Sequence, residues 1–286
     1  MICQSMRQEL PSAVSSVQMK NVSFAYESAG TNETPAPVLQ NVNLCIRQGE
    51  CVVLCGRSGC GKTTLLRLVN GLAPHFYRGT LCGEIRVNDL NTVESDLPEI
   101  SRIVGSVFQN PRTQFFHTDT TGEMAFNLEN QAIPREQMQI RLRETSDRLK
   151  LDGLMDRNIF ELSGGEKQQI ACGSVYASMP DVVVMDEPSS NLDMEGIRKL
   201  QTNIRTMKEA GKTILISEHR MWYLEHIADR YLYVENEQIA REFAPEEIVR
   251  LSQKKPGNHG ASSCEPGAAA NGSQGKPGGE RPEGME

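Results

Sequence analysis

Several features that define other classes of protein are missing from this sequence of 286 residues. Its eight cysteines include no C-x-x-C pair and no Cys/His set with zinc-finger spacing, which disfavours a zinc module or a disulfide framework. No apolar run approaches the ~20 residues of a membrane helix, and residues 1–12 lack the basic-then-apolar pattern of a signal peptide. We therefore expect reduced thiols and no direct membrane insertion, so any membrane role must come through a partner.

An excess of positive charge is also missing. Lys and Arg number 30 and Asp and Glu number 37, for a net charge of -7, and the basic residues are scattered along the chain. Nucleic-acid-binding proteins carry clustered basic residues, so this balance predicts no nucleic-acid partner. The hydrophobic fraction of 38% is sufficient for one large domain or two small lobes.

The apolar pattern predicts a strand-rich frame interrupted by helices. Strands are expected at 17–26, 38–46, 50–55, 84–87, 103–108, 181–185, 212–217 and 230–235. Helices are expected at 62–72, 121–130 and 135–149, and another begins at Ser163. A frame of this kind indicates an α/β core with an inserted helical subdomain at about 110–170.

The two ends differ in composition from the middle of the chain. We expect a main domain over 17–252, preceded by an N-terminal extension at 1–16. Gly, Pro, Ser, Ala and charged residues dominate 253–286, and such a segment buries too little apolar surface to offset its ordering entropy. We expect a disordered tail there, with a tether or docking tail as the alternative.

A phosphate-binding loop lies between the strand at 50–55 and the helix at 62–72. It matches the pattern G-x-x-x-x-G-K-T, with the residues Gly56-Arg57-Ser58-Gly59-Cys60-Gly61-Lys62-Thr63, followed by Thr64. Its glycines allow backbone N–H groups to converge on phosphate oxygens, and the helix N-terminus adds positive potential. We expect Lys62 to reach the β- and γ-phosphates of ATP and the Thr63 hydroxyl to bind Mg²⁺.

Two acids follow the apolar strand at 181–185. Asp186 ends the strand, where a charge is costly unless it serves a cation, so it is a candidate partner of Mg²⁺. Glu187 lies just beyond and is suitably placed to act as general base toward the attacking water. A strand-end turn with incidental acids is the alternative, which the neighbouring phosphate loop disfavours.

The segment at 162–168 combines a helix cap with two glycines. Ser163 and Glu166 form a predicted capping box. Gly164 and Gly165 are not needed for a cap, and each costs up to about 1 kcal/mol relative to Ala in a helical turn. Close approach of a phosphate to the helix N-terminus would explain them. The position of the segment along the chain favours a nucleotide held by a neighbouring copy.

Together these motifs resemble those of the ATP-binding subunit of an ABC transporter, over roughly residues 17–250. The resemblance implies a P-loop NTPase fold, with a RecA-like core, an antiparallel β subdomain and a helical insertion. It implies that Tyr26 stacks on adenine, although a core aromatic is the alternative. Gln109 would sense the γ-phosphate and Mg²⁺, Asp193 would signal across a dimer, and His219 would hold the γ-phosphate and the water. Many relatives have Thr-His-Asp where this chain has 218–220, and the role of Arg220 is open.

A narrower resemblance involves the segments 107–116, 119–126 and 217–220. These are similar to the energy-coupling factor importers, which take up vitamins or transition-metal ions. The resemblance implies a second ATPase subunit, a transmembrane scaffold subunit, a substrate-binding membrane protein and a place at the cytoplasmic face of the membrane. Phe115 and Phe116 would then lie near the groove for a coupling helix, or both rings would pack inside the helical lobe.

Two other functions fit parts of the sequence. A soluble ABC ATPase acting on ribosomes, DNA or cofactor assembly would share these motifs, but the acidic charge balance disfavours nucleic acid. A regulatory or inactive subunit is disfavoured because every reacting group is present. The substrate and the choice between homodimer and heterodimer are not encoded in these motifs.

Overall fold

The computed structural model describes residues 15–27 and 36–253. Most of the expected N-terminal extension, residues 28–35 and nearly all of the expected tail lie outside the described residues. Ser15 and Ser16, the last two residues assigned to the extension, belong to the first strand.

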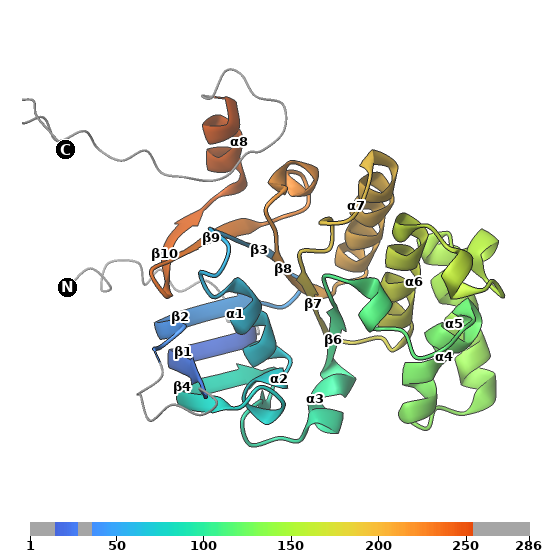
Figure 1. The fold of residues 1–286 in the computed structure, drawn as a ribbon, viewed down its shortest axis with the longest axis horizontal. Coiled ribbons are helices and arrows are strands. Elements are labelled where there is room, and N and C mark those ends of the chain that lie inside the picture. Colours follow the sequence, from blue (N-terminus) through green and yellow to red (C-terminus); the bar gives the residue numbers. More distant parts are fainter. Residues whose placement is uncertain (1–14, 28–35, 254–286) are drawn as a thin grey trace, which may run out of the picture.

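The first part of the chain forms an antiparallel sheet, seen at the lower left of Figure 1. Its order is β2-β1-β4-β5, and β1 pairs on both sides, with Met19 opposite Leu44 of β2 and Ile85 of β4. The strands are β1 (Ser15–Tyr26), β2 (Leu39–Arg47), β4 (Gly79–Val87) and β5 (Leu90–Asn91).

A second sheet of six strands has the order β10-β9-β3-β8-β7-β6, and its strands from β9 to β6 are parallel. All five residues of β3 are buried, as expected for a parallel strand covered on both faces. The carboxyl ends of these parallel strands lie side by side, so the loops after β3, β6, β7 and β8 lie together at that end of the sheet. The strands are β3 (Cys51–Cys55), β6 (Val104–Val107), β7 (Val182–Asp186), β8 (Thr213–Ser217), β9 (Arg230–Glu235) and β10 (Gln238–Phe243).

Helices cover both faces of this sheet and extend beyond one side, where α4, α5 and α6 gather at the right of Figure 1. The α-helices are α1 (Lys62–Val69), α2 (Leu72–His75), α3 (Leu97–Ile103), α4 (Thr120–Asn130), α5 (Arg135–Leu149), α6 (Gly164–Ala177), α7 (Met194–Glu209) and α8 (Pro245–Gln253). The short 3-10 helices are η1 (Pro111–Thr113), η2 (Asp152–Leu154), η3 (Ile159–Glu161) and η4 (Met221–Leu224). In the described part of the chain, every helix is too short or too polar to cross a membrane.

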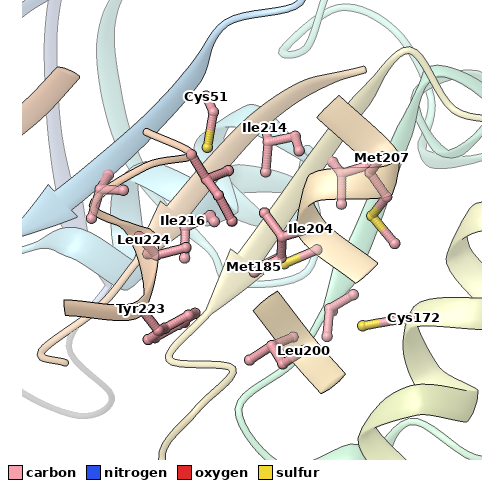
Figure 2. Packing of buried hydrophobic residues seen from close by; sticks show 14 of the residues in the cluster. Cys51, Cys172, Met185, Leu200, Ile204, Met207, Ile214, Ile216, Tyr223 and Leu224 are labelled. Carbon is pink, nitrogen blue, oxygen red and sulfur yellow. The ribbon is translucent and has the colours of Figure 1, made fainter. Parts of the chain in front are cut away.

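Alternate residues of the parallel strands enter two hydrophobic clusters on opposite faces. On β3, Val53 packs into the cluster shared with α6 and α7, whereas Val52 packs into the cluster shared with α1 and the antiparallel sheet. Figure 2 shows part of the first cluster, where Met185 and Ile216 from the sheet lie near Ile204 of α7. The six-stranded sheet is thus packed on both faces, and this packing fixes the strand ends from which the loops of the site begin.

The expected α/β core, antiparallel subdomain and helical insertion are all present, with several corrections to element bounds. The helix expected at 62–72 ends at Val69, because Gly71 adopts a left-handed φ of 75°. The strand expected at 84–87 begins at Gly79, because β1 continues its pairing as far as Tyr26. Helices α3, α7 and α8 and strand β10 were not predicted.

Candidate functional site

The loop 56–63 connects the end of β3 to the start of α1. Lys62 is buried, and its Nζ donates to the carbonyl oxygens of Gly56 and Arg57 at 2.9 and 3.0 Å. Gly56 has φ 142°, and a Cβ there would lie 2.3 Å from the Val234 carbonyl oxygen, so a larger residue is excluded. A Cβ at Gly59 would meet nothing within 4 Å, which leaves that stretch of backbone open to a ligand. The loop therefore has the form of a cradle for phosphate.

A pair of oxygen-bearing side chains stands next to this cradle. The Thr63 hydroxyl donates to Asp186 Oδ1 at 3.1 Å, and the Ser217 hydroxyl donates to the same oxygen at 2.6 Å. Hydroxyl and carboxylate oxygens are the ligands that Mg²⁺ accepts, usually together with phosphate oxygens and water. The arrangement of Thr63 and Asp186 fits a magnesium ion that accompanies a bound nucleotide.

Three predicted residues from three different loops converge beside this pair. Glu187 Oε2 accepts a hydrogen bond from Gln109 Nε2 at 3.0 Å, and Glu187 Oε1 lies 3.1 Å from His219 Nε2. Gln109 follows β6, Glu187 follows β7 and His219 follows β8, so the common edge of the sheet brings them together. An amide, a carboxylate and an imidazole thus lie within hydrogen-bond distance of one another, next to the phosphate loop.

Glu187 itself has an unusual backbone. Its φ is 43°, a left-handed conformation that non-glycine residues seldom adopt and that costs on the order of 1–3 kcal/mol. Its N–H donates to both the carbonyl and the hydroxyl of Ser217 at 3.0 and 3.1 Å, which holds the turn in place. Backbone strain of this kind is concentrated at functional sites.

The start of α6 carries the predicted capping box. Ser163 Oγ accepts from the Glu166 N–H at 3.3 Å, and Glu166 Oε2 accepts from the Ser163 N–H at 2.8 Å. The hydrogen bond from the Ser163 backbone lowers the pKa of Glu166. A Cβ at Gly165 would lie 3.3 Å from the Cα of Gly196, so tight packing against α7 accounts for this glycine within the chain.

Gly164 has no such explanation within the chain. A Cβ there would meet only the carbonyl oxygen of Asn191, at an ordinary 3.5 Å. The first turn of α6 also belongs to the helix that covers the face of the sheet opposite to α1. Asp193, which was predicted to signal across a dimer, caps α7: its carboxylate accepts from the Gly196 N–H at 2.8 Å.

Comparison with known proteins places the chain in a family. The family model described as ABC transporter matches residues 39–190, more than half of the chain. A Pyrococcus abyssi protein, provisionally named an ABC transporter ATP-binding protein, is 38% identical over 233 residues, 81% of each chain. The chain belongs to the ABC transporter family. It carries the ATP-binding domain of that family, and such domains are ATPases.

Other members of the ABC family differ in length. A Treponema denticola protein, also provisionally named an ABC transporter ATP-binding protein, is 50% identical over 237 residues, which cover 83% of this chain but 47% of the relative. The chain thus spans about half the length of that relative.

Solved structures of ABC proteins confirm the P-loop NTPase fold. One is cbiO1 from Clostridium perfringens, described as part of the ABC transporter complex cbiONQ, with a TM-score of 0.73, 22% identity and coverage of 84% of this chain and 92% of that one. Another is the ATP-binding cassette MJ0796, described as a dimer in a post-hydrolysis state with ADP and Pi. It has a TM-score of 0.69 and 26% identity, and the match covers 80% of this chain and 98% of that one.

The predicted adenine contact of this ABC domain lies at the end of β1. Tyr26 is half-buried, and its hydroxyl lies 3.0 Å from Thr64 Oγ1 and accepts from Arg67 at 3.2 Å. Its ring meets the edges of Phe24 and Tyr77 at centroid distances of 4.9 and 6.4 Å. These contacts use the hydroxyls of both Tyr26 and Thr64 within the chain, and the stacking of Tyr26 on adenine stays a prediction.

The two predicted interface aromatics point in different directions. Phe115 packs against the core cluster beneath α6, whereas Phe116 is 74% exposed and stacks on Phe126 at 4.6 Å between centroids. Buried Glu123 fixes this turn by accepting from the Phe116 and His117 N–H groups at 2.7 and 2.9 Å. The alternative that both rings pack inside the helical lobe is therefore wrong for Phe116, and the contact with a coupling helix stays a prediction.

A groove opens beside the exposed ring. It has a volume of about 540 Å³ and lies between α3, β6 and α4. Its apolar lining includes Leu97, Phe108, Phe116, Phe126 and Val175.

Sequence reasoning missed two residues of the site. Ser217 ends β8, and its hydroxyl contacts the Asp186 carboxylate and the Glu187 N–H. Glu218 follows it and is only 2% exposed. An acid directly after a fully buried strand is the same signal that identified Asp186, so Glu218 was open to prediction on that ground.

Proposed function

We propose that this chain is the ATP-hydrolysing subunit of an energy-coupling factor type importer for a vitamin or a transition-metal ion. The observation that carries the enzymatic part is the convergence of Gln109, Glu187 and His219 beside the phosphate loop. A carboxylate held between an amide donor and an imidazole is suited to position water against a bound phosphate.

The binding roles follow from the geometry of the loop. The 56–63 backbone and Lys62 would hold the phosphates of ATP, while Thr63 and Asp186 would hold the magnesium ion. When bound, magnesium neutralises charge on the phosphates. Glu187 then accepts a proton from the attacking water, and Gln109 and His219 orient it.

A second ATPase head would complete the site. Within each chain, α1 and α6 cover opposite faces of the six-stranded sheet, as Figure 1 shows. The backbone around Gly164 is open within its own chain, so it suits the phosphate of a nucleotide held by another head. The dimeric MJ0796 cassettes support a two-headed assembly.

Sequence segments, one structural neighbour and a surface groove support the importer class. The segments 107–116 and 217–220 resemble that group, and the cbiO1 neighbour is described as part of a transporter complex. The groove near Phe116 offers apolar surface for a coupling helix of a membrane scaffold, which would place the chain at the cytoplasmic face of a membrane.

A mixing experiment tests the shared site. Lys62→Ala removes the phosphate contact, and Gly164→Val places a side chain in the open position with little strain in its own fold. Each variant alone should hydrolyse ATP at a few per cent of the wild-type rate. If the chain forms a homodimer, an equimolar mixture of the two variants contains dimers with one copy of each. In such a dimer, one site combines the damaged loop with the damaged helix end, and the other site is intact. Random pairing predicts about one quarter of wild-type turnover.

Two results would count against this scheme. Full activity of Gly164→Val alone would remove the helix end from the site, and an inactive mixture would exclude a homodimer with shared sites. Gentle solubilisation of native membranes with the tagged chain tests the importer class. A small membrane scaffold and a substrate-binding membrane protein are the expected partners, whereas ribosomes or DNA would favour a soluble ABC ATPase.

A further inference from the structure

A buried carboxylate stands between the two loops that end β7 and β8. Glu218 is 2% exposed, and its own N–H continues the sheet by donating to the Leu54 carbonyl at 3.0 Å. Its Oε1 accepts from the Ser189 N–H at 3.0 Å and from the Tyr223 hydroxyl at 2.7 Å. Its Oε2 accepts from the N–H groups of His219 and Arg220 at 2.8 and 3.1 Å. One side chain thus receives four hydrogen bonds.

The partners of Glu218 are themselves held firmly. Tyr223 is fully buried, in the cluster of Figure 2, where it lies near Leu224 and Leu200. Burial and the neighbouring carboxylate raise the pKa of Tyr223 well above its usual value, so its hydroxyl stays a donor at physiological pH. Ser189 is also fully buried. Both oxygens of the Glu218 carboxylate and the Tyr223 hydroxyl are bonded in this buried network, which makes it rigid, because a displaced group loses bonds that water cannot replace.

Arg220 strengthens the same connection from the surface. Its guanidinium donates to the carbonyl oxygens of Ser189 and Leu192 at 3.4 and 3.3 Å. Both ends of loop 189–193 are therefore tied to residues 218–220, which carry His219 between them. Asp193, at the far end of this loop, caps α7, and Gly196 in the first turn of α7 packs against Gly165 of α6.

The contacts form a continuous chain from one reactive group to the helix end that would face a neighbour. We propose that Glu218 is a positioning residue that holds loop 189–193 and the His219 backbone as one rigid unit, with Arg220 as its surface clamp. This inference rests on the proposed function for its catalytic consequence, although the structural link itself does not. It also gives Arg220, whose role was open, a definite task.

Replacement of Glu218 by Gln should break the unit with little change in volume. Three of the four groups that bond to the carboxylate are backbone N–H groups, which can only donate. A Gln side chain has one acceptor oxygen and one NH₂ group, so the NH₂ must face at least one of these donors. Either Ser189 or the pair His219 and Arg220 then loses its acceptor.

Hydrogen exchange in the nucleotide-free full-length chain tests the link without any ATPase activity. In Glu218→Gln we expect amide exchange about tenfold faster in peptides covering both 187–194 and 218–224. Asp229→Asn is the matched control, because the Asp229 carboxylate accepts the Cys51 N–H at 2.8 Å at the opposite end of β3. That control should leave both peptides unchanged.

Tyr223→Phe provides a second variant that keeps the ring and removes one donor. We expect exchange about two- to threefold faster in the same two peptides. Unchanged exchange in 187–194 in both folded variants would overturn the inference. If Glu218→Gln does not fold, the amide exchange measured in Tyr223→Phe decides whether the inference stands.

Steady-state kinetics test the catalytic consequence. Glu218→Gln should lower kcat about tenfold or more, with the KM for ATP within about twofold, because the phosphate loop is untouched. In a His219→Ala background the same change should lower kcat by less than about twofold. Equal effects in both backgrounds would show that Glu218 does not act through His219. A wild-type chain without ATPase activity would refute the proposed function but leave the exchange result to judge the link.

Discussion

Glu187→Gln separates the chemical step from binding at the proposed site. The wild-type carboxylate contacts Gln109 Nε2 at 3.0 Å and His219 Nε2 at 3.1 Å. In the variant, the amide oxygen can accept from Gln109, and the NH₂ group can donate to His219 when its proton lies on Nδ1. Both contacts survive, and Gln meets the same backbone strain as Glu at this φ of 43°.

We expect Glu187→Gln to lower kcat without weakening ATP binding or the stability of the fold. A positioned general base contributes about 10²–10⁴-fold, which corresponds to about 3–5 kcal/mol in the activation free energy. The amide has no basicity to offer, so kcat should fall by at least about 100-fold. The dissociation constant for ATP should stay within about twofold, and the unfolding midpoint within about 1 °C.

Phosphate release and equilibrium ATP binding measure the two effects on the same preparation. Glu187→Ala is a useful contrast, because it removes both contacts and leaves the Gln109 amide without its partner. It should lose turnover and also change the position of Gln109. Turnover of Glu187→Gln within about threefold of wild type would refute the assignment of Glu187 as the base.

Two further predictions concern the scaffold. Burial raises the pKa of two thiols to about 12, so iodoacetamide at pH 8 should label them only after unfolding, whereas two exposed cysteines should react in the native chain. The protected cysteines are Cys51 and Cys172, and the reactive ones are Cys45 and Cys82. Peptide mass spectrometry checks this, and rapid native labelling of Cys172 would contradict it. Gly105→Ala should lower the free energy of unfolding by about 1–3 kcal/mol in denaturant titration, because its Cβ would lie 2.5 Å from Val175 Cγ1. Gly153→Ala, with nothing within 4 Å, should be nearly neutral, and equal effects of the two changes would refute the packing argument.

Most strands were predictable because burial on both faces leaves continuous apolar runs, as in β3 and β7. Strand β10 escaped prediction because it lies at the edge of the sheet and only Phe243 is buried, so its pattern is weak. Helix α7 does carry a signal, since Ile197, Leu200 and Ile204 are buried on one face at helical spacing. That helix was available to sequence reasoning and was overlooked.

The capping box at Ser163 was predicted correctly because it depends only on residues three apart. The paired glycines were interpreted as one feature, but they differ. Gly165 packs closely against Gly196, a contact between α6 and α7 that no local pattern reveals, whereas Gly164 remains open. Similarly, Phe115 and Phe116 are adjacent in sequence but lie on opposite sides of one turn.

By itself, the sequence determined which chemical groups are available and the local shapes that carry them. The phosphate loop, the strand-end acids and the helix cap are short-range features, governed by backbone preferences and side-chain chemistry over a few residues. Only the tertiary structure decided which of these groups meet. Gln109, Glu187 and His219 come together because the carboxyl ends of the parallel strands lie side by side. Glu218 joins the loops after β7 and β8, because its buried carboxylate accepts hydrogen bonds from Ser189 and from His219.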